Sequence, residues 1–296
     1  MDVLSLFDGM SCGQIALNKL GIDYGTYFAS EIDKAAIDVT LDNFPNTIQV
    51  GDVTKLKGSD FPNVNLLIGG SPCQGFSFAG KQLNFTDPRS MLFFEYVRLL
   101  KEIKPKYFLL ENVKMKQEYQ DVISEYLGVK PVEINSSIVS AHDRKRLYWT
   151  NIPFDVNSIE NKHLTIEDIL DDVVDESLFI NEHIANRFVE NKNHKDITTK
   201  SCVIGRLSPY QGDRVFSTLC KGSSLSASGG NNGGGSCNII IDPATGKLRK
   251  LSINECERLQ TAPDDYTKVA PKTQRYKMLG NGWTVDVIAS IFKYLK

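Results

Sequence analysis

The chain has few of the residues that build metal sites, disulfide frameworks or membrane spans. Its 296 residues include 6 cysteines and 4 histidines, and the cysteines form no CxxC pair. This spacing indicates neither a zinc site nor a set of disulfides. No apolar run approaches the ~20 residues that a membrane span needs, and no signal peptide opens the chain. We therefore expect a cytoplasmic protein, in a reducing compartment, with no metal and no membrane partner.

A second absence concerns nucleotide binding. The chain lacks the GxGxxG fingerprint, which disfavours a pyrophosphate cofactor and a nicotinamide dehydrogenase. It does open with an apolar strand at residues 3–7, followed by Asp8-Gly9-Met10-Ser11-Cys12-Gly13 and a helical pattern that Gly21 ends. A strand, a glycine-containing loop and a helix start form the usual cradle for a nucleotide-like ligand.

Acidic residues follow the next two predicted strands. Residues 24–29 lead into Glu31-Ile32-Asp33, and residues 47–50 lead into Asp52. An acid at the end of the second strand suits the hydroxyls of a ribose. Taken singly, each acid is better explained as a solvated loop residue or a helix cap. Their order along the chain favours a ligand site.

Residues 69–77, Gly-Gly-Ser-Pro-Cys-Gln-Gly-Phe-Ser, place a cysteine where a nucleophile would lie. The apolar run at 64–68 predicts a buried strand that the Gly69-Gly70 pair ends. Pro72 restricts the backbone before Cys73, and Gly75 frees it afterwards. A thiol at the carboxyl end of a central strand faces the crevice where open α/β sheets bind ligands. The alternative is a packed free cysteine, which the polar glycine and proline frame disfavours.

Two further segments carry charged groups beside predicted strands. Glu111 ends the apolar strand at 107–110, where it is placed to donate a proton or hydrogen bond to a base ring. Its alternative role is to cap the helix that begins near Met115. Arg144 and Arg146 precede a strand at 147–150 and alternate with Lys145, so in an extended segment both guanidinium groups face one side. There they would fix an anion or a carboxylate.

These motifs together resemble those of the C5-cytosine DNA methyltransferases. Phe7-Asp8-Gly9 resembles the family's first cofactor loop, Glu31 its ribose acid and Asp52 its adenine-contacting acid. The Pro-Cys, ENV and R-x-R motifs are matched by Pro72-Cys73, Glu111-Asn112-Val113 and Arg144-Lys145-Arg146. The blocks at 249–260 and at Gly280-Asn281-Gly282 resemble the two closing motifs. The resemblance covers about residues 1–152 and 247–295 and leans toward the branch of the animal de novo enzymes and short phage and bacterial enzymes.

The resemblance implies a reaction and a set of site residues. The Cys73 thiolate would add to C6 of a cytosine flipped out of duplex DNA. Glu111 would hold the N3 and amine edge, while Arg144 and Arg146 would orient the base or Glu111. S-adenosylmethionine would donate the methyl group without a metal. The residues expected at this cofactor are Phe7, Gly9, Met10, Ser11, Glu31, Ile32, Asp52, Val53, Pro72, Asn281 and Trp283.

The chain departs from the family pattern at two places. His142 stands where the family often has glutamine, and Trp283-Thr284-Val285 stands where many members have a small residue before the valine. Neither departure removes a reactive group. One alternative is a tRNA methyltransferase, but the Cys-Phe-Thr signature of that branch is absent. A catalytically inactive binding protein is the other, and the intact Cys73 and Glu111 disfavour it.

Strands alternate with helices over residues 1–150, which predicts a doubly wound, mostly parallel α/β sheet, and the resemblance implies the S-adenosylmethionine-dependent methyltransferase type. The alternation then stops. Residues 180–248 are rich in turn residues that would join short strands, and the resemblance implies that they form a small, irregular, β-rich target-recognition domain. The catalytic domain would therefore be discontinuous, with residues 1–179 and 249–296, and a capping box formed by Ser252 and Glu255 would begin a helix in its second part.

The net charge of −2 is unevenly distributed. Residues 1–70 and 71–185 each carry a net charge of −5, whereas residues 186–296 carry 17 basic and 9 acidic side chains. An anionic polymer would therefore meet the last third first. We expect Arg206, Arg214 and Lys221 to contact DNA there. The short chain favours a monomeric bacterial or phage enzyme, with a restriction endonuclease as a possible partner.

Overall fold

The computed structural model describes residues 1–72, 88–193, 195, 199–210, 213–230, 234–236 and 238–296. The chain forms two compact units. Unit 1 comprises Met1–Ile134, Lys145–Ser158 and Val287–Lys296, and unit 2 comprises Asn135–Arg144 and Ile159–Asp286. These boundaries describe compactness. The predicted division into a catalytic domain and a recognition domain at 179/180 and 248/249 concerns function and stays a prediction.

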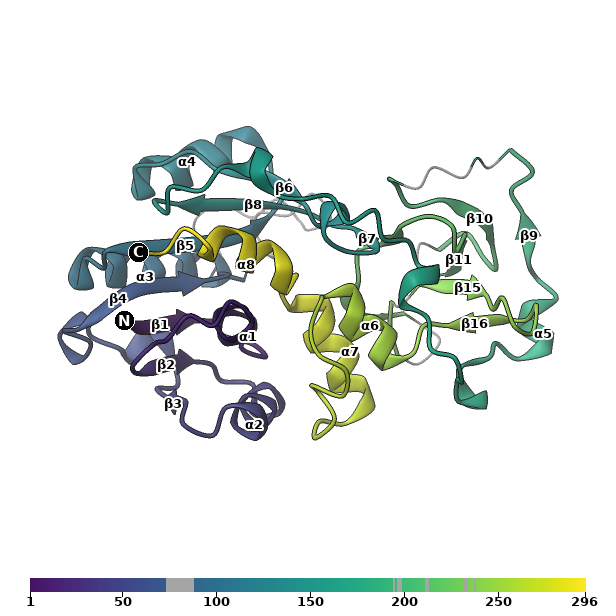
Figure 1. Cartoon of the computed structure of the whole chain (residues 1–296), viewed down its shortest axis with the longest axis horizontal. Helices are drawn as coiled ribbons and strands as arrows, with labels where there is room; N and C mark the ends of the chain where they lie inside the picture. The colour runs from purple at the N-terminus through teal and green to yellow at the C-terminus, as the bar shows by residue number, and fades with distance from the viewer. Residues whose placement is uncertain (73–87, 194, 196–198, 211–212, 231–233, 237) are drawn as a thin grey trace. The chain divides into compact units, whose positions relative to one another are not determined.

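Unit 1 is built on a seven-stranded sheet with the strand order β3-β2-β1-β4-β5-β8-β6 (Figure 1). Strands β1 to β5 run parallel, whereas β8 runs antiparallel to β5. The predicted α/β, mostly parallel sheet is therefore confirmed. The strands are β1 (Asp2–Leu6), β2 (Tyr27–Ser30), β3 (Ile48–Gln49), β4 (Val64–Gly69), β5 (Tyr107–Val113), β6 (Val132–Asn135) and β8 (Lys145–Thr150).

Helices connect the parallel strands of unit 1. They are α1 (Cys12–Lys19), α2 (Lys34–Asn43), α3 (Pro88–Ile103) and α4 (Gln117–Leu127), with short 3₁₀ turns at Val53–Lys55, Gly58–Asp60 and Val156–Ser158. Local chemistry fixes their ends. The Asp33 carboxylate accepts the backbone N–H of Ala35 at the start of α2, and Gly128, with a φ of 71°, ends α4. Within the described ranges, no helix is both long and apolar enough to cross a membrane.

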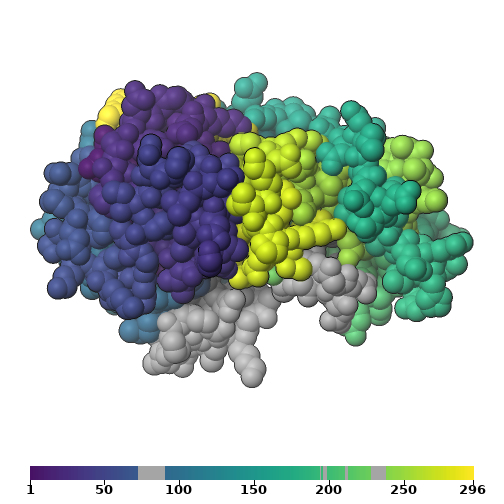
Figure 2. Space-filling model, turned by 90° about the horizontal axis from the view of Figure 1, so that it is seen from below, coloured from purple at the N-terminus to yellow at the C-terminus, as the bar shows by residue number. Residues whose placement is uncertain are grey.

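The central strands are apolar because both faces of the sheet are covered. Leu4 and Leu67 are fully buried, and they belong to one cluster with Phe93 from α3 and Trp149 from β8. In the space-filling view, the purple and blue part of unit 1 presents a continuous surface of packed side chains (Figure 2). This packing holds the carboxyl ends of β1 to β5 along one edge of the sheet. The strand order reverses between β1 and β4, which marks this edge as the ligand-binding crevice of an open α/β sheet.

Unit 2 contains a five-stranded sheet with the order β16-β15-β11-β10-β9. This sheet confirms the predicted small β-rich region. Its strands are β9 (Val189–Glu190), β10 (Val203–Arg206), β11 (Arg214–Phe216), β15 (Ile239–Ile241) and β16 (Leu248–Lys250), and the shorter pairs are β7 (His142–Asp143) with β12 (Gly222–Ser223) and β13 (Ser226–Gly230) with β14 (Gly234–Ser236). Its core contains the buried side chains of Leu207, Val215, Ile239 and Leu248.

The helices of unit 2 are α5 (Glu182–Ala185), α6 (Ile253–Leu259) and α7 (Lys272–Asn281), with 3₁₀ turns at Ser136–Ile138, Glu167–Ile169 and Glu176–Leu178. The predicted capping box is present at the start of α6. The Ser252 hydroxyl accepts the N–H of Glu255 at 3.0 Å, and the Glu255 carboxylate accepts the N–H of Ser252 at 2.6 Å. The last helix, α8 (Val285–Phe292), begins at the end of unit 2 and continues into unit 1.

Candidate active site

The loop between β1 and α1 has an unusual backbone. Phe7, Gly9 and Ser11 have φ angles of 57°, 58° and 60°. Positive φ is strained for a phenylalanine and a serine, and such strain persists where the surrounding structure enforces it, often at ligand-binding loops. Met10 and Ser11 are buried, and Phe7 is half-buried against the core cluster of unit 1. The loop therefore has a backbone conformation that its packing enforces, and it lies after β1 at the carboxyl edge of the sheet.

Glu31 holds this loop in place. One carboxylate oxygen, Oε2, accepts the backbone N–H of Gly9 at 2.8 Å. The other oxygen, Oε1, accepts the N–H groups of Ile32 and Asp33 at 2.7 and 2.9 Å. Because a carboxylate offers about four acceptor positions, Oε2 keeps capacity for a further donor such as a hydroxyl. Glu31 and the first loop, both predicted at the cofactor, are therefore in contact, and their role at the cofactor stays a prediction.

The end of β3 lies next to the end of β2, since the Ser30 hydroxyl donates to the Gly51 carbonyl at 2.6 Å. Asp52 caps the following 3₁₀ turn by accepting the N–H and hydroxyl of Thr54, and these hydrogen bonds lower the pKa of the Asp52 carboxyl. Val53 is buried in the core. Ile32, by contrast, is 78% exposed.

Asp8 is a charged group that we assigned no role from the sequence. The Tyr27 hydroxyl donates to its Oδ1 at 3.0 Å, and its buried Oδ2 has no hydrogen-bond partner among the described residues. Burial is the largest cause that raises the pKa of Asp8 from 3.8 to about 6. The signal was present in the sequence as an acid between Phe7 and Gly9, but its burial depends on the packing of Tyr27 from β2.

Cys73, the predicted nucleophile, lies outside the described residues. The structure does describe the two residues that precede it. Ser71, two positions earlier at the end of β4, is buried, and its hydroxyl accepts the amide of Asn112 at 3.5 Å. Pro72 is exposed. The start of the Pro-Cys loop is thereby joined to the end of β5.

Glu111 forms an ion pair with Arg146. The Arg146 Nε atom lies 3.1 Å from Glu111 Oε1, and the two side chains are 16% and 10% exposed. The pairing of β5 with β8 explains the contact, because Val113 lies opposite Arg146 and Glu111 lies opposite Tyr148. A carboxylate is thus held, oriented and largely shielded at the sheet edge that carries Ser71.

Arg144 has a different environment from the one that its spacing predicts. It belongs to unit 2, between β7 and β8, and is 2% exposed. Its Nη1 donates to the Ser224 hydroxyl and the Leu225 carbonyl, and its Nη2 donates to the carbonyls of Gly280 and Gly282. A guanidinium group enclosed by these acceptors positions protein segments. The predicted role of Arg144 in orienting the base or Glu111 does not fit this geometry.

The Gly280-Asn281-Gly282 block ends α7 in unit 2. A Cβ atom on Gly280 would lie 2.5 Å from the backbone nitrogen of Ala227 in β13, so this position needs glycine for the close approach of two backbones. Asn281 is exposed and Trp283 is half-buried. Both are described within unit 2, and their predicted contact with a cofactor stays a prediction.

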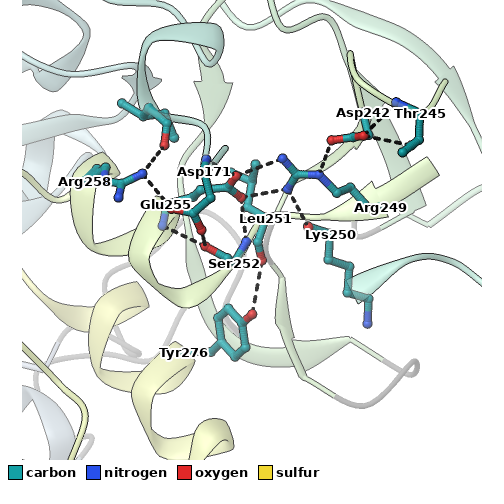
Figure 3. A network of polar contacts seen from close by, with 11 residues as sticks. Asp171, Asp242, Thr245, Arg249, Lys250, Leu251, Ser252, Glu255, Arg258 and Tyr276 are labelled. Atoms are coloured by element: carbon teal, nitrogen blue, oxygen red, sulfur yellow. Dashed lines mark hydrogen bonds and ion pairs between the residues drawn. The ribbon is translucent and has the colours of Figure 1, made fainter. Parts of the chain in front are cut away.

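The block at 249–260 forms a buried polar network in unit 2 (Figure 3). Arg249 is fully buried and pairs with Asp242 and Glu255, each at 2.8 Å. Glu255 also accepts the N–H of Asp171 at 2.9 Å, and Arg258 pairs with Asp171 at 2.8 Å. The network ties β16 and the start of α6 to the loop around residue 171. Its charges are paired, as buried charges must be.

The whole chain, residues 1–296, matches the C-5 cytosine-specific DNA methylase family. The chain is a member of this family. The type II methyltransferase M1.ScrFI of Lactococcus lactis subsp. cremoris is 32% identical over 286 residues, which cover 89% of this chain and 70% of the relative. The type II methyltransferase M.HhaI of Haemophilus parahaemolyticus is 30% identical, with 97% of this chain and 92% of the relative covered. The predicted activity, DNA (cytosine-5-)-methyltransferase, is therefore confirmed.

Solved structures show the same fold for this C5-cytosine DNA methyltransferase. The Entamoeba histolytica methyltransferase EhMeth matches with a TM-score of 0.75 at 19% identity, covering 100% of this chain and 99% of that one. The S. pombe Dnmt2 methyltransferase matches with a TM-score of 0.69 at 17% identity, covering 100% of this chain and 99% of that one. Membership of the family implies S-adenosylmethionine as methyl donor and DNA as substrate. Within the described residues, no cluster of His, Cys, Asp or Glu side chains could hold a metal ion.

The three basic residues predicted to contact DNA have different environments in this methyltransferase. Arg206 is exposed and lies opposite Arg214 across the β10–β11 pair. Arg214 lies over the ring of Phe216, with its guanidinium carbon 5.5 Å from the ring centre. Lys221 is 2% exposed, and its ammonium donates to the carbonyls of Ser140 and Leu164. A buried ammonium held by carbonyls does not fit the predicted DNA contact at Lys221.

Proposed function

We propose that this methyltransferase methylates C5 of a cytosine flipped out of duplex DNA, through a covalent adduct with Cys73. The observation that carries the proposal is the Glu111–Arg146 ion pair, held at the carboxyl edge of the sheet next to Ser71 and so to the start of the Cys73 loop. Cys73 follows β4 in the sequence and Glu111 lies near the end of β5, the neighbouring strand, which suits attack on one ring by a thiol and a carboxyl group.

The proposed reaction uses the side chains as follows. The Cys73 thiolate forms a bond to C6 as the C5–C6 π bond breaks. That electron pair forms a C4–C5 double bond, and the π pair of the C4–N3 bond takes a proton from Glu111 at N3. S-adenosylmethionine supplies an electrophilic methyl group. Methyl transfer to C5 would leave S-adenosylhomocysteine, and N3 would return its proton to Glu111. A water molecule would then take the C5 proton, and the electron pair left at C5 would restore the C5–C6 double bond as the C6–S bond breaks and releases the Cys73 thiolate. Arg146 supports Glu111 in this sequence, because its guanidinium, 3.1 Å from Oε1, holds the carboxylate in place at the end of β5.

The cofactor residues are proposed from the fit of their chemistry. Glu31 retains an acceptor position for a ribose hydroxyl, and Ile32 offers an exposed apolar side chain to the adenine ring. Asp52 uses Oδ1 to cap the turn after it, which leaves its Oδ2 for the adenine amine. Phe7, Gly9, Met10 and Ser11 form the strained loop, with Pro72, Val53, Asn281 and Trp283 completing the proposed set.

For DNA recognition we retain Arg206 and Arg214 and leave out Lys221. Like charges directly opposite each other on paired strands destabilise a sheet. The Arg206–Arg214 pair is such an arrangement, and Arg206 lowers the pKa of Arg214 further than burial alone. A phosphate between two guanidinium groups would remove this repulsion, which supports a backbone contact with DNA at β10 and β11.

The decisive experiment traps the adduct. In duplex DNA with 5-fluorocytosine at the target, fluorine replaces the C5 proton and blocks the elimination, so the wild type with S-adenosylmethionine should form a complex that resists denaturation and maps to Cys73. Cys73→Ala should form none and yet bind DNA. The Glu111→Gln variant should lose adduct formation by about 10²–10⁴-fold, as expected for a missing general acid. An adduct on another cysteine, or tRNA methylated faster than duplex DNA, would overturn the proposal.

A further inference from the structure

A buried hydroxyl in unit 2 joins the two positions at which the chain departs from the family pattern. His142 Nε2 lies 3.1 Å from the Thr284 hydroxyl oxygen. The same oxygen lies 2.8 Å from the Ser136 hydroxyl and 3.0 Å from Oε1 of Gln260. All of these side chains are at most 1% exposed. The two positions that depart from the family pattern therefore contact each other.

The hydrogen-bonding capacity of these groups fixes their roles. The Gln260 amide nitrogen donates to the carbonyls of Leu279 and Gly282 at 2.5 and 3.2 Å, so its Oε1 is the atom that faces Thr284. The single proton of the Thr284 hydroxyl therefore goes to Gln260. Its two lone pairs accept from Ser136 and from His142, so the imidazole presents Nε2–H. The Thr284 hydroxyl therefore uses its one donor and both of its acceptor positions, and water cannot replace a partner at a fully buried site.

This cluster supports the segment that ends α7. Gln260 binds the carbonyls of residues 279 and 282, and Arg144 binds those of Gly280 and Gly282. The backbone N–H of Val285 donates to the Gln260 carbonyl at 2.9 Å. The exposed Asn281 and the half-buried Trp283 therefore project from a backbone whose carbonyls are fixed from two sides. His142 and Arg144 come from the same stretch of chain, so that stretch sets the position of the whole segment.

We propose that His142 and Thr284 are a matched pair of positioning residues that hold the Gly280–Thr284 segment in its cofactor-binding conformation. This inference rests on the proposed function, in which Asn281 and Trp283 contact S-adenosylmethionine. The pair acts through Gln260, because the hydroxyl of Thr284 fixes the amide that holds residues 279 and 282. A donor at position 142 and a hydroxyl at position 284 are what the arrangement requires, so glutamine at 142 and serine at 284 should both be tolerated.

The test measures the Kd of S-adenosylmethionine by calorimetry, in the full chain without DNA. Thr284→Val keeps the shape but removes the hydroxyl, and we expect a roughly 5- to 30-fold weaker Kd, as for a buried hydrogen-bonding group left unsatisfied. His142→Leu should weaken it similarly. Thr284→Ser and His142→Gln should stay within about threefold of the wild type. The double variant with Val and Leu should be no weaker than the worse single variant, because both remove one shared contact.

A matched control separates positioning from general loss of stability. Thr267 is also fully buried in unit 2, where its hydroxyl contacts Glu257 and accepts Nε of Arg275 at 2.7 Å. Thr267→Val should lower the urea midpoint but keep the cofactor Kd within twofold. Equal weakening by Thr267→Val, or an unchanged Kd in Thr284→Val, would overturn the inference. Glu31→Ala tests the proposed function separately: if it also leaves the Kd unchanged, the cofactor assignment itself fails.

Discussion

Replacing Asp8 by asparagine should stabilise unit 1, and the gain should grow with pH. Burial raises the pKa of this carboxyl from 3.8 to about 6, while the Tyr27 hydroxyl donates to Oδ1 and the Glu31 carboxylate adds a smaller upward effect. Between these two pH values the unfolded chain has released the proton and the folded chain has kept it. Stability therefore falls as pH rises through this window. Above the window, the folded protein contains a buried carboxylate, one oxygen of which has no hydrogen-bond partner in the part of the chain that the structure describes.

The magnitude follows from the size of the pKa change. One pKa unit corresponds to about 1.4 kcal/mol, so a rise of this size makes the ionised Asp8 cost about 2–3 kcal/mol at pH 8. Asparagine does not titrate, and its carbonyl oxygen can still accept the Tyr27 hydroxyl. We expect Asp8→Asn to be more stable than the wild type by about 2–3 kcal/mol at pH 8 and by under ~1 kcal/mol at pH 4.

The assay is urea unfolding from pH 4 to pH 8 without cofactor. The chain has 2 tryptophans. A Trp283→Phe background leaves the fully buried Trp149 to report on unit 1 by fluorescence. Glu102→Gln is the control of opposite sign, because the Gly58 N–H lowers the pKa of Glu102; its loss of stability should shrink as pH falls. A constant separation between the Asp8→Asn and wild-type curves across this range would refute the reasoning.

Three further predictions concern unit 2. Arg249→Leu leaves Asp242 and Glu255 buried without their partner, so it should lower the free energy of unfolding by about 3–5 kcal/mol. The Arg258 side chain is 30% exposed, so Arg258→Leu should lower the free energy of unfolding by only about 1 kcal/mol. Equal losses of the two variants in urea melts would contradict this prediction. Gly280→Ala forces a Cβ against the backbone of Ala227 and should destabilise unit 2 by about 1–3 kcal/mol, measured by circular dichroism in urea; an unchanged midpoint would show that β13 moves freely. Arg206→Ala should stabilise the fold by about 0.2–1 kcal/mol by removing a like-charged pair, yet reduce the salt slope of DNA binding by about one unit. Lys221→Ala should lower the stability of the fold and leave the salt slope of DNA binding unchanged. Filter-binding titrations at several salt concentrations measure the slopes of both variants.

The sequence alone determined the framework of the sheet and the edge at which the site lies. Runs such as residues 64–68 and 107–110 are apolar because both faces of a parallel sheet are covered, and their carboxyl ends must then share one edge. The positions of Glu31 and Asp52 along that edge follow from where β2 and β3 stop, whereas β5 extends past the predicted end at residue 110 to Val113 because it pairs with β8. The capping box at Ser252 and Glu255 was equally readable, since it depends on a spacing of three residues within one helix turn.

Tertiary structure decided how individual charges are used. Alternation placed Arg144 and Arg146 on one face, but β7 ends and β8 begins between them, so Arg146 pairs with Glu111 while Arg144 supports the end of α7. A sequence does not show whether a basic side chain is exposed to solvent or bound by backbone carbonyls. The carbonyls that bind the Lys221 ammonium belong to Ser140 and Leu164, which are distant in the chain. Asp8 and the contact of His142 with Thr284 depend in the same way on partners from other elements. Local spacing fixes backbone geometry, whereas desolvation and partner choice are set by residues that only folding brings together.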